Sequence, residues 1–188
     1  MTRSRQTADW GSRAGLAKIV PSSVAVGSGT GSADALGTVT FSGVSSLSLN
    51  SFITSNYDKY KIYLDCTAST LLQVYFRFRT GSTDKATEYY GAGYKSNYAG
   101  TVGSNQAKNN GTEGWVTQAG SSGNYVDFDL YKASATRAAI KGLASDQNDA
   151  QVVMFAYWNN GLTSSVDGFT IYPSTGTISG TLRIYGYN

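Results

Sequence analysis

The chain has 188 residues, of which 40% are hydrophobic and only 14% are charged, and its formal net charge is +3. The hydrophobic share is large enough for a core, which excludes global disorder, and the length suits one all-β domain or one domain with an appendage. So small a net charge argues against nucleic acid as the main partner, because phosphate binding needs clustered cations.

Residues 1–36 differ in composition from the rest of the chain. A basic, Trp-containing segment comes first and is followed by a Gly/Ser-rich stretch that is typical of flexible linkers. The sequence therefore predicts an N-terminal anchoring arm and linker over 1–36, with a disordered tail as the alternative. The residues expected to anchor the arm to a partner are Arg3, Arg5, Asp9, Trp10 and Arg13.

The chain lacks the patterns of export and membrane insertion. No apolar segment follows the N-terminal arginines, and no apolar run approaches the ~20 residues that a membrane span needs. We therefore expect a protein that is made in a cytoplasm, does not insert into a membrane, and leaves the cell as part of a particle. The single Cys66 excludes an internal disulfide, and its apolar strand pattern predicts a buried, inert thiol.

From residue 38 onward the hydrophobic period is two, and no window has a helical period. The segment 59–66 matches a half-buried strand, and 72–79 does so equally well. The last segment, 168–187, predicts a closing hairpin whose second strand lies inside a sheet. The pattern indicates an all-β fold: a single antiparallel β-sandwich or jelly roll over 37–188, preceded by the extended arm. The further predicted strands are 38–41, 46–49, 114–117, 125–131, 138–143 and 151–158.

The least strand-like part of the body is 80–111, which is rich in Gly, Asn and Tyr. Long loops of this kind are often functional, and Tyr and Trp offer a flat apolar face with a polar group. These aromatic residues are candidates for contact with a glycan or with a neighbouring subunit, and the sequence leaves both alternatives open. They are Tyr89, Tyr90, Tyr94, Tyr98 and Trp115.

The residue types needed for common catalytic sites are missing. The chain has no His, which excludes a Ser-His-Asp triad, a Cys-His pair and a His-ligated metal. Asp127 and Asp129 are the best carboxylate pair, but their spacing on one strand predicts a solvated outer face rather than a glycosidase site. The sequence thus predicts a protein that is not an enzyme and that binds no cofactor or metal.

Three motifs in the body and one at the N-terminus resemble bacteriophage virion proteins. The run 3–9 resembles the leader "R-[AS]-R-D-x-A-D" of tail fibres from short-tailed marine phages, with Gln6 in place of the usual Asp. The body is similar to phage jelly-roll modules in 52–64, which contains "YDKYKIYL", in 76–81, and in the ending "SGTLRIYGY". The resemblance implies a jelly roll in the virion, often a homotrimer, without catalysis.

Two functions follow from this resemblance. In the first, the chain is a tail-fibre or adhesin subunit whose arm anchors to a tail adaptor or nozzle, while the body meets a host surface glycan. In the second, it is a capsid decoration, or cement, protein whose arm contacts the major capsid protein. The leader favours the first. A carbohydrate-active enzyme is a third reading, which the missing catalytic residues disfavour.

Overall fold

The computed structural model describes residues 15–96, 102–131, 137–146 and 151–188. Within these ranges the chain forms sixteen strands and no helix, and every strand pair is antiparallel. The strands are arranged in one sheet of ten and one of six, called here the large sheet and the small sheet.

Strands distant in the sequence are neighbours in both sheets. The large sheet has the order β10 (Val102–Gly111), β9 (Tyr89–Ser96), β14 (Gln151–Asn159), β13 (Ala138–Asp146), β12 (Asn124–Tyr131), β6 (Lys59–Ala68), β16 (Ile178–Tyr187), β4 (Thr38–Val44) and β3 (Thr30–Ala33), with β1 (Ala17–Ile19) pairing with β16. The small sheet has the order β11 (Gly114–Ala119), β7 (Leu72–Thr80), β15 (Gly168–Pro173), β5 (Leu47–Asn50) and β2 (Ser23–Val26), with β8 (Thr83–Asp84) pairing with β7.

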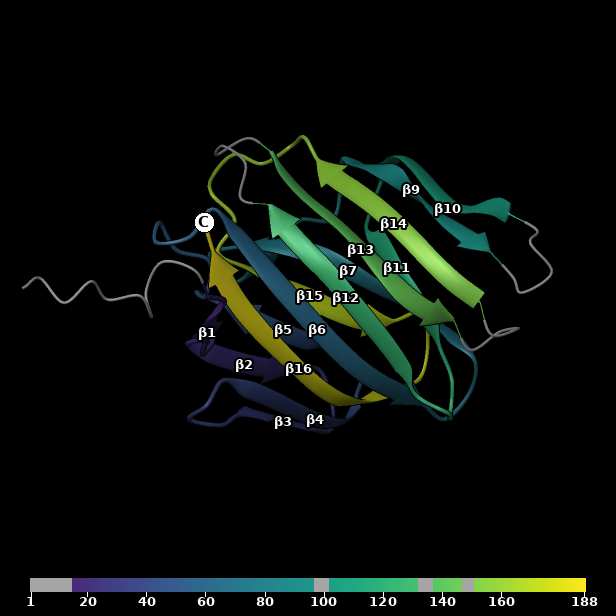
Figure 1. Ribbon diagram of the computed structural model, residues 1–188, viewed down its shortest axis with the longest axis horizontal. Coiled ribbons are helices and arrows are strands. Elements are labelled where there is room, and N and C mark those ends of the chain that lie inside the picture. The colour runs from purple at the N-terminus through teal and green to yellow at the C-terminus, as the bar shows by residue number, and fades with distance from the viewer. Residues whose placement is uncertain (1–14, 97–101, 132–136, 147–150) are drawn as a thin grey trace, which may run out of the picture.

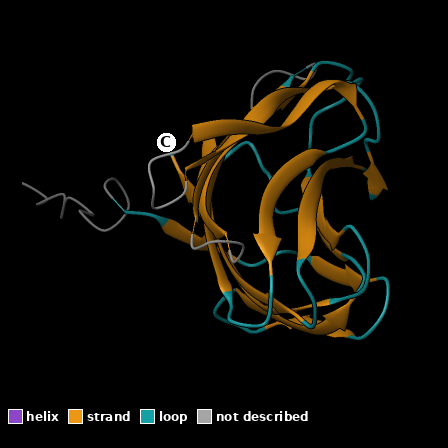
Figure 2. Cartoon of the chain, turned by 90° about the vertical axis from the view of Figure 1, so that its right-hand side faces the viewer, coloured by secondary structure: helices purple, strands orange, loops and turns teal. Residues whose placement is uncertain are grey.

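The two sheets pack face to face. The large sheet lies in front of the small sheet in Figure 1, and the two layers are seen from the side in Figure 2. Alternation along each strand turns one set of side chains into the space between the layers. In β6 the buried set is the predicted one, Tyr60, Ile62, Leu64 and Cys66. The prediction of an all-β antiparallel sandwich is confirmed.

The last two strands do not pair with each other as a hairpin. β15 joins the small sheet between β7 and β5, whereas β16 joins the large sheet between β6 and β4. The connection after Pro173 therefore crosses from one sheet to the other. The expected strands and the interior position of β16 are confirmed, but the expected pairing is wrong. A Pro/Gly turn between two strands gives the same local signal for a hairpin as for a crossing between sheets.

The Gly/Ser-rich stretch is part of the sandwich. β2 pairs with β5 and β3 pairs with β4, so 23–26 and 30–33 lie in the sheets rather than in a flexible linker. Gly29, between β2 and β3, has a φ of +69°, and a Cβ there would lie 2.1 Å from the Ser42 carbonyl oxygen. Small residues here serve a tight turn and close strand approach. The body therefore begins near residue 17 instead of 37. The predicted anchoring residues, 3–13, lie outside the described residues.

The region 80–111 is also more regular than its composition predicts. It contains β8, β9 and β10, and β9 pairs with β14 over eight residues. Gly91 has a structural role in β9. Its φ is +137°, and a Cβ there would lie 2.1 Å from the Ala156 carbonyl oxygen. Glycine is thus required by close backbone approach within the sheet and does not mark a loop.

Candidate functional site

The outer face of the large sheet, which points away from the small sheet, is built from residues aligned in rows across neighbouring strands. The strand register places Lys61 of β6 between Tyr185 of β16 and Asp129 of β12. Asp129 in turn stands beside Lys141 of β13. Successive rows are two residues apart because side chains alternate between the faces. Another row runs through Arg183, Tyr63, Asp127, Leu143, Met154 and Tyr94.

An ion cluster occupies the centre of this face. The Lys61 ammonium contacts the Asp127 carboxylate and lies 3.5 Å from Asp129 Oδ1. The Tyr187 hydroxyl donates a 2.9 Å hydrogen bond to Asp129 Oδ1. Burial acts to lower the pKa of Lys61, but the two carboxylates outweigh it and the pKa is raised. Asp127 and Asp129 face outward on one strand as predicted, and Lys61 forms ion pairs with both, which is a structural arrangement.

Tyrosine rings surround the ion cluster. Tyr63 lies between Tyr125 and Tyr185, with ring centroids 6.2 Å and 5.8 Å away. The Lys59 ammonium lies 5.8 Å from the ring centroids of both Tyr131 and Tyr187. A rigid sheet thus displays several aromatic rings at fixed spacing. Such rings suit stacking on a ligand or packing against a partner.

A strip of large apolar side chains continues the same face over β9, β13 and β14. Each member has 40% to 57% of its surface exposed, and Trp158 stacks on Tyr90 with ring centroids 6.2 Å apart. β14 is apolar on both of its faces, a pattern typical of strands that are covered on both sides. Contiguous exposed apolar surface of this kind marks an interaction site. We define this apolar strip as Tyr94, Leu143, Val152, Met154 and Trp158.

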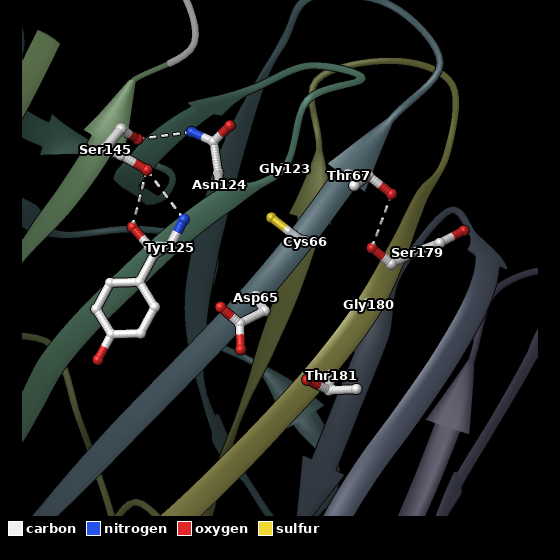
Figure 3. A pocket seen from close by; sticks show the side chains of 10 residues that line it. All are labelled: Asp65, Cys66, Thr67, Gly123, Asn124, Tyr125, Ser145, Ser179, Gly180 and Thr181. Atoms are coloured by element: carbon white, nitrogen blue, oxygen red, sulfur yellow. Dashed lines mark hydrogen bonds between the residues drawn. The ribbon is translucent and has the colours of Figure 1, made fainter. Parts of the chain in front are cut away.

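Described residues of this face line two hollows. The first, of about 440 Å³, is formed by β6, β12, β13 and β16, and Figure 3 shows the residues that line it. The second, of about 370 Å³, lies between the ion cluster and the apolar strip, where Lys61 and Lys141 approach Leu143 and Met154. Both hollows are open to solvent rather than enclosed.

The predicted aromatic candidates do not form one site. Tyr89 and Trp115 are completely buried in the core, so the expectation that they contact a glycan or another subunit is wrong. Tyr89 faces inward on β9, where its hydroxyl accepts a 2.7 Å hydrogen bond from Phe78 N and donates one of 2.9 Å to Lys85 O. Trp115 lies under Lys95, whose ammonium is 5.5 Å from the ring centroid.

The other candidates have different positions. Tyr90 is half-buried against Trp158, and Tyr94 belongs to the exposed apolar strip. Tyr98 lies outside the described residues. The sequence reasoning missed Asp65, Tyr63 and Tyr125 on the same face. Their outward positions on predicted strands were a usable signal, because alternation assigns them to the face opposite the core.

The described segments give no sign of a metal centre. Among their residues, no three His, Cys, Asp or Glu side chains gather closely enough to hold an ion. Cys66 is buried as predicted, and burial raises the pKa of its thiol to about 12. In the same segments, no helix is long and apolar enough to cross a membrane.

Comparison with known proteins identifies no family for this chain. No family model matches the chain, and no curated protein matches it. A solved alginate lyase mutant, in complex with an alginate tetrasaccharide, aligns over 80% of this chain and 81% of its own with 11% identity and a TM-score of 0.31. A TM-score this low carries no argument about fold or function.

Proposed function

We propose that the chain is a non-enzymatic structural protein of a bacteriophage particle, a tail-fibre or adhesin subunit that presents the outer face of the large sheet for host attachment. The observation that carries the proposal is the aromatic and apolar surface of that face. Its apolar strip keeps 40% to 57% of each side chain exposed, and exposed apolar patches often mark interaction sites. As part of a particle, it supplies a rigid contact surface.

The resemblance to phage modules supports the choice of the outer face of the large sheet as the contact surface. Residues 59–64 of the first motif and the ending 179–187 belong to β6 and β16, which pair along their whole length. Their outward residues include Lys61, Tyr63 and Tyr185, which build the centre of the outer face. These two motifs therefore supply adjacent strands of one surface.

A capsid decoration protein is the second candidate, and the apolar strip favours it. Leu143, Val152 and Met154 are the kind of side chains that proteins cover in stable contacts. A shell of major capsid proteins would provide such a cover. In this case the outer face of the large sheet would point toward the shell instead of the host.

The copy number of the chain in purified particles tests both candidates. Quantitative mass spectrometry against the major capsid protein should give a few to a few tens of copies for a fibre or adhesin. Hundreds of copies would replace the first candidate with the second. Absence from particles would overturn the virion proposal altogether.

The proposed arm has a test of its own. A chain that lacks residues 1–14 retains β1 and its pairing with β16, so we expect it to fold and to form the same oligomer, which we propose is a homotrimer. It should fail to enter particles if the arm anchors it. Normal incorporation would show that the anchor lies elsewhere.

A further inference from the structure

We propose that the first hollow on the outer face of the large sheet binds a neutral sugar residue, with Asp65 accepting hydrogen bonds from two adjacent sugar hydroxyls and Tyr125 stacking on the sugar ring. This inference rests on the proposed attachment function and deepens it. It names the class of ligand, a neutral sugar, and the residues of the outer face that would bind it.

The hollow has a backbone floor and side-chain walls. Asn124, Cys66 and Gly180 are aligned across three paired strands. The side chains of Asn124 and Cys66 are buried, and Gly180 has none, so none of the three rises above the sheet. The row on one side consists of Tyr125, Asp65 and Thr181, and the row on the other of Gly123, Thr67 and Ser179.

Asp65 is the acceptor that the hollow offers to a ligand. Its side chain is exposed, and none of the ion pairs or hydrogen bonds of the described residues reaches its carboxylate. It differs in this from Asp127 and Asp129, which share Lys61. A carboxylate has two oxygens, and its hydrogen bonds are stronger than those between neutral groups. Two neighbouring hydroxyls of a sugar match this pair of oxygens.

Tyr125 supplies the flat apolar surface. It is 46% exposed on the strand next to Asp65, and its backbone N–H donates to Ser145 Oγ at 3.0 Å, which ties β12 to β13 at this point. Its ring is tilted by 33° to that of Tyr63. The exposed ring offers an apolar face to the C–H face of a sugar, and the side chains of Thr181 on β16 and Thr67 on β6 also line the hollow.

The charge of the hollow selects the class of sugar. Asp65 is the charged side chain among the ten residues that line it, and the others are neutral. The Cys66 thiol does not ionise near neutral pH, since burial raises its pKa to about 12. A uronate, sulfate or sialate group would meet the Asp65 carboxylate with no cation among the residues that line the hollow. A neutral sugar meets only hydroxyls, a carboxylate and an aromatic ring.

Binding of the purified full-length protein to immobilised oligosaccharides tests the inference. The panel holds neutral probes built from glucose, galactose, mannose, fucose or rhamnose, and acidic probes that carry uronate, sulfate or sialate. The wild-type protein should bind one or more neutral probes and none of the acidic ones. Binding to acidic probes alone, or to no probe, would overturn the inference.

Four variants locate the binding. Asp65→Asn and Tyr125→Ala should each weaken binding about tenfold or more, the change expected from loss of a charged hydrogen-bond partner or of a stacked ring. Tyr125→Phe keeps the ring and should stay within about threefold of wild type. Asp58→Asn, an exposed carboxylate outside the hollow, is the matched control and should bind normally. Normal binding by folded Asp65→Asn protein would overturn the assignment.

The same experiment separates this inference from the proposed function. A chain found in particles that binds no neutral sugar would leave the virion proposal standing and refute the sugar site. A chain that is absent from particles but binds neutral sugars through Asp65 would refute the virion proposal and leave the sugar site standing. Thermal unfolding of each variant shows whether lost binding comes from lost folding.

Discussion

The two outer faces of the sandwich use polar residues in different ways. On the small sheet, Arg79 donates to Asp84, Ser48, Thr170, Asn50 and the Ser82 carbonyl. On the large sheet, Asp65 stands without such partners among the described residues, beside exposed Tyr125 and the apolar strip. The small-sheet face pairs its charged groups within the chain, whereas the large-sheet face leaves Asp65 available beside its paired ion cluster.

A second network on the small sheet reinforces the contrast. Glu113 accepts a 2.8 Å hydrogen bond from the Lys108 ammonium and one of 3.3 Å from the Tyr172 hydroxyl. Arg77 lies 3.5 Å from Glu113 Oε2, and its guanidinium is 4.8 Å from the Tyr172 ring centroid. Each group has a partner within the chain, so substitutions here should affect stability. Substitutions on the large-sheet face should affect binding.

The largest expected effect is on the small sheet. Arg79→Ala would leave Asp84 and several hydroxyls without their donor, and we expect the free energy of unfolding to fall by about 3 kcal/mol. Urea denaturation measures this. The matched variant Arg183→Ala, on the large-sheet face, should change the free energy of unfolding by less than ~0.5 kcal/mol. Equal losses for both variants would remove the contrast between the faces.

Replacing Glu113 should lower the free energy of unfolding by less than replacing Arg79 does, and this loss should depend on pH. Burial acts to raise its pKa, but hydrogen bonds from Lys108 and Thr112 outweigh it, so the pKa is lowered from 4.5. A lowered carboxyl pKa stabilises the fold above the unfolded-state value and ceases to do so as pH falls through the folded-state value. Glu113→Gln should therefore cost about 1–2 kcal/mol at neutral pH, and the difference from wild type should shrink below pH 4.5.

The control for Glu113 is Asp65→Asn. Because the Asp65 carboxylate has no cationic partner among the described residues, we expect this variant to unfold within ~0.5 kcal/mol of wild type at neutral pH. Urea titrations at several pH values compare the two carboxylates directly. If Asp65→Asn lowered the free energy of unfolding as much as Glu113→Gln does, Asp65 would be a structural residue.

The smallest change in stability is expected in the apolar strip. Leu143→Ser and Met154→Ser remove side chains that already face solvent, so the free energy of unfolding should move by less than ~0.5 kcal/mol. Retention on a hydrophobic-interaction column should nevertheless decrease. A loss of more than about 1 kcal/mol would instead assign the strip to packing within the chain.

The fold was more predictable from the sequence than the site. Alternation in β6 and β7 identified the buried faces, because the hydrophobic period depends only on local geometry. Such local patterns do not predict which strands β15 pairs with or that Tyr89 is buried. A strand's period of two does not tell which sheet it joins, and a Tyr in a Gly-rich segment gives no sign that close backbone contacts hold it in the core. The hollow beside Asp65 needs four strands, β6, β12, β13 and β16, that the register brings together.

The central claim is that the outer face of the large sheet is the binding face of the molecule. Its most direct test is the adsorption rate onto host cells of particles that carry Tyr125→Ala or, on the small-sheet face, Tyr75→Ala, at equal copy number. We expect adsorption to fall about tenfold for Tyr125→Ala and to stay within about twofold for Tyr75→Ala. Normal adsorption with Tyr125→Ala, or an equal loss with Tyr75→Ala, would contradict the claim.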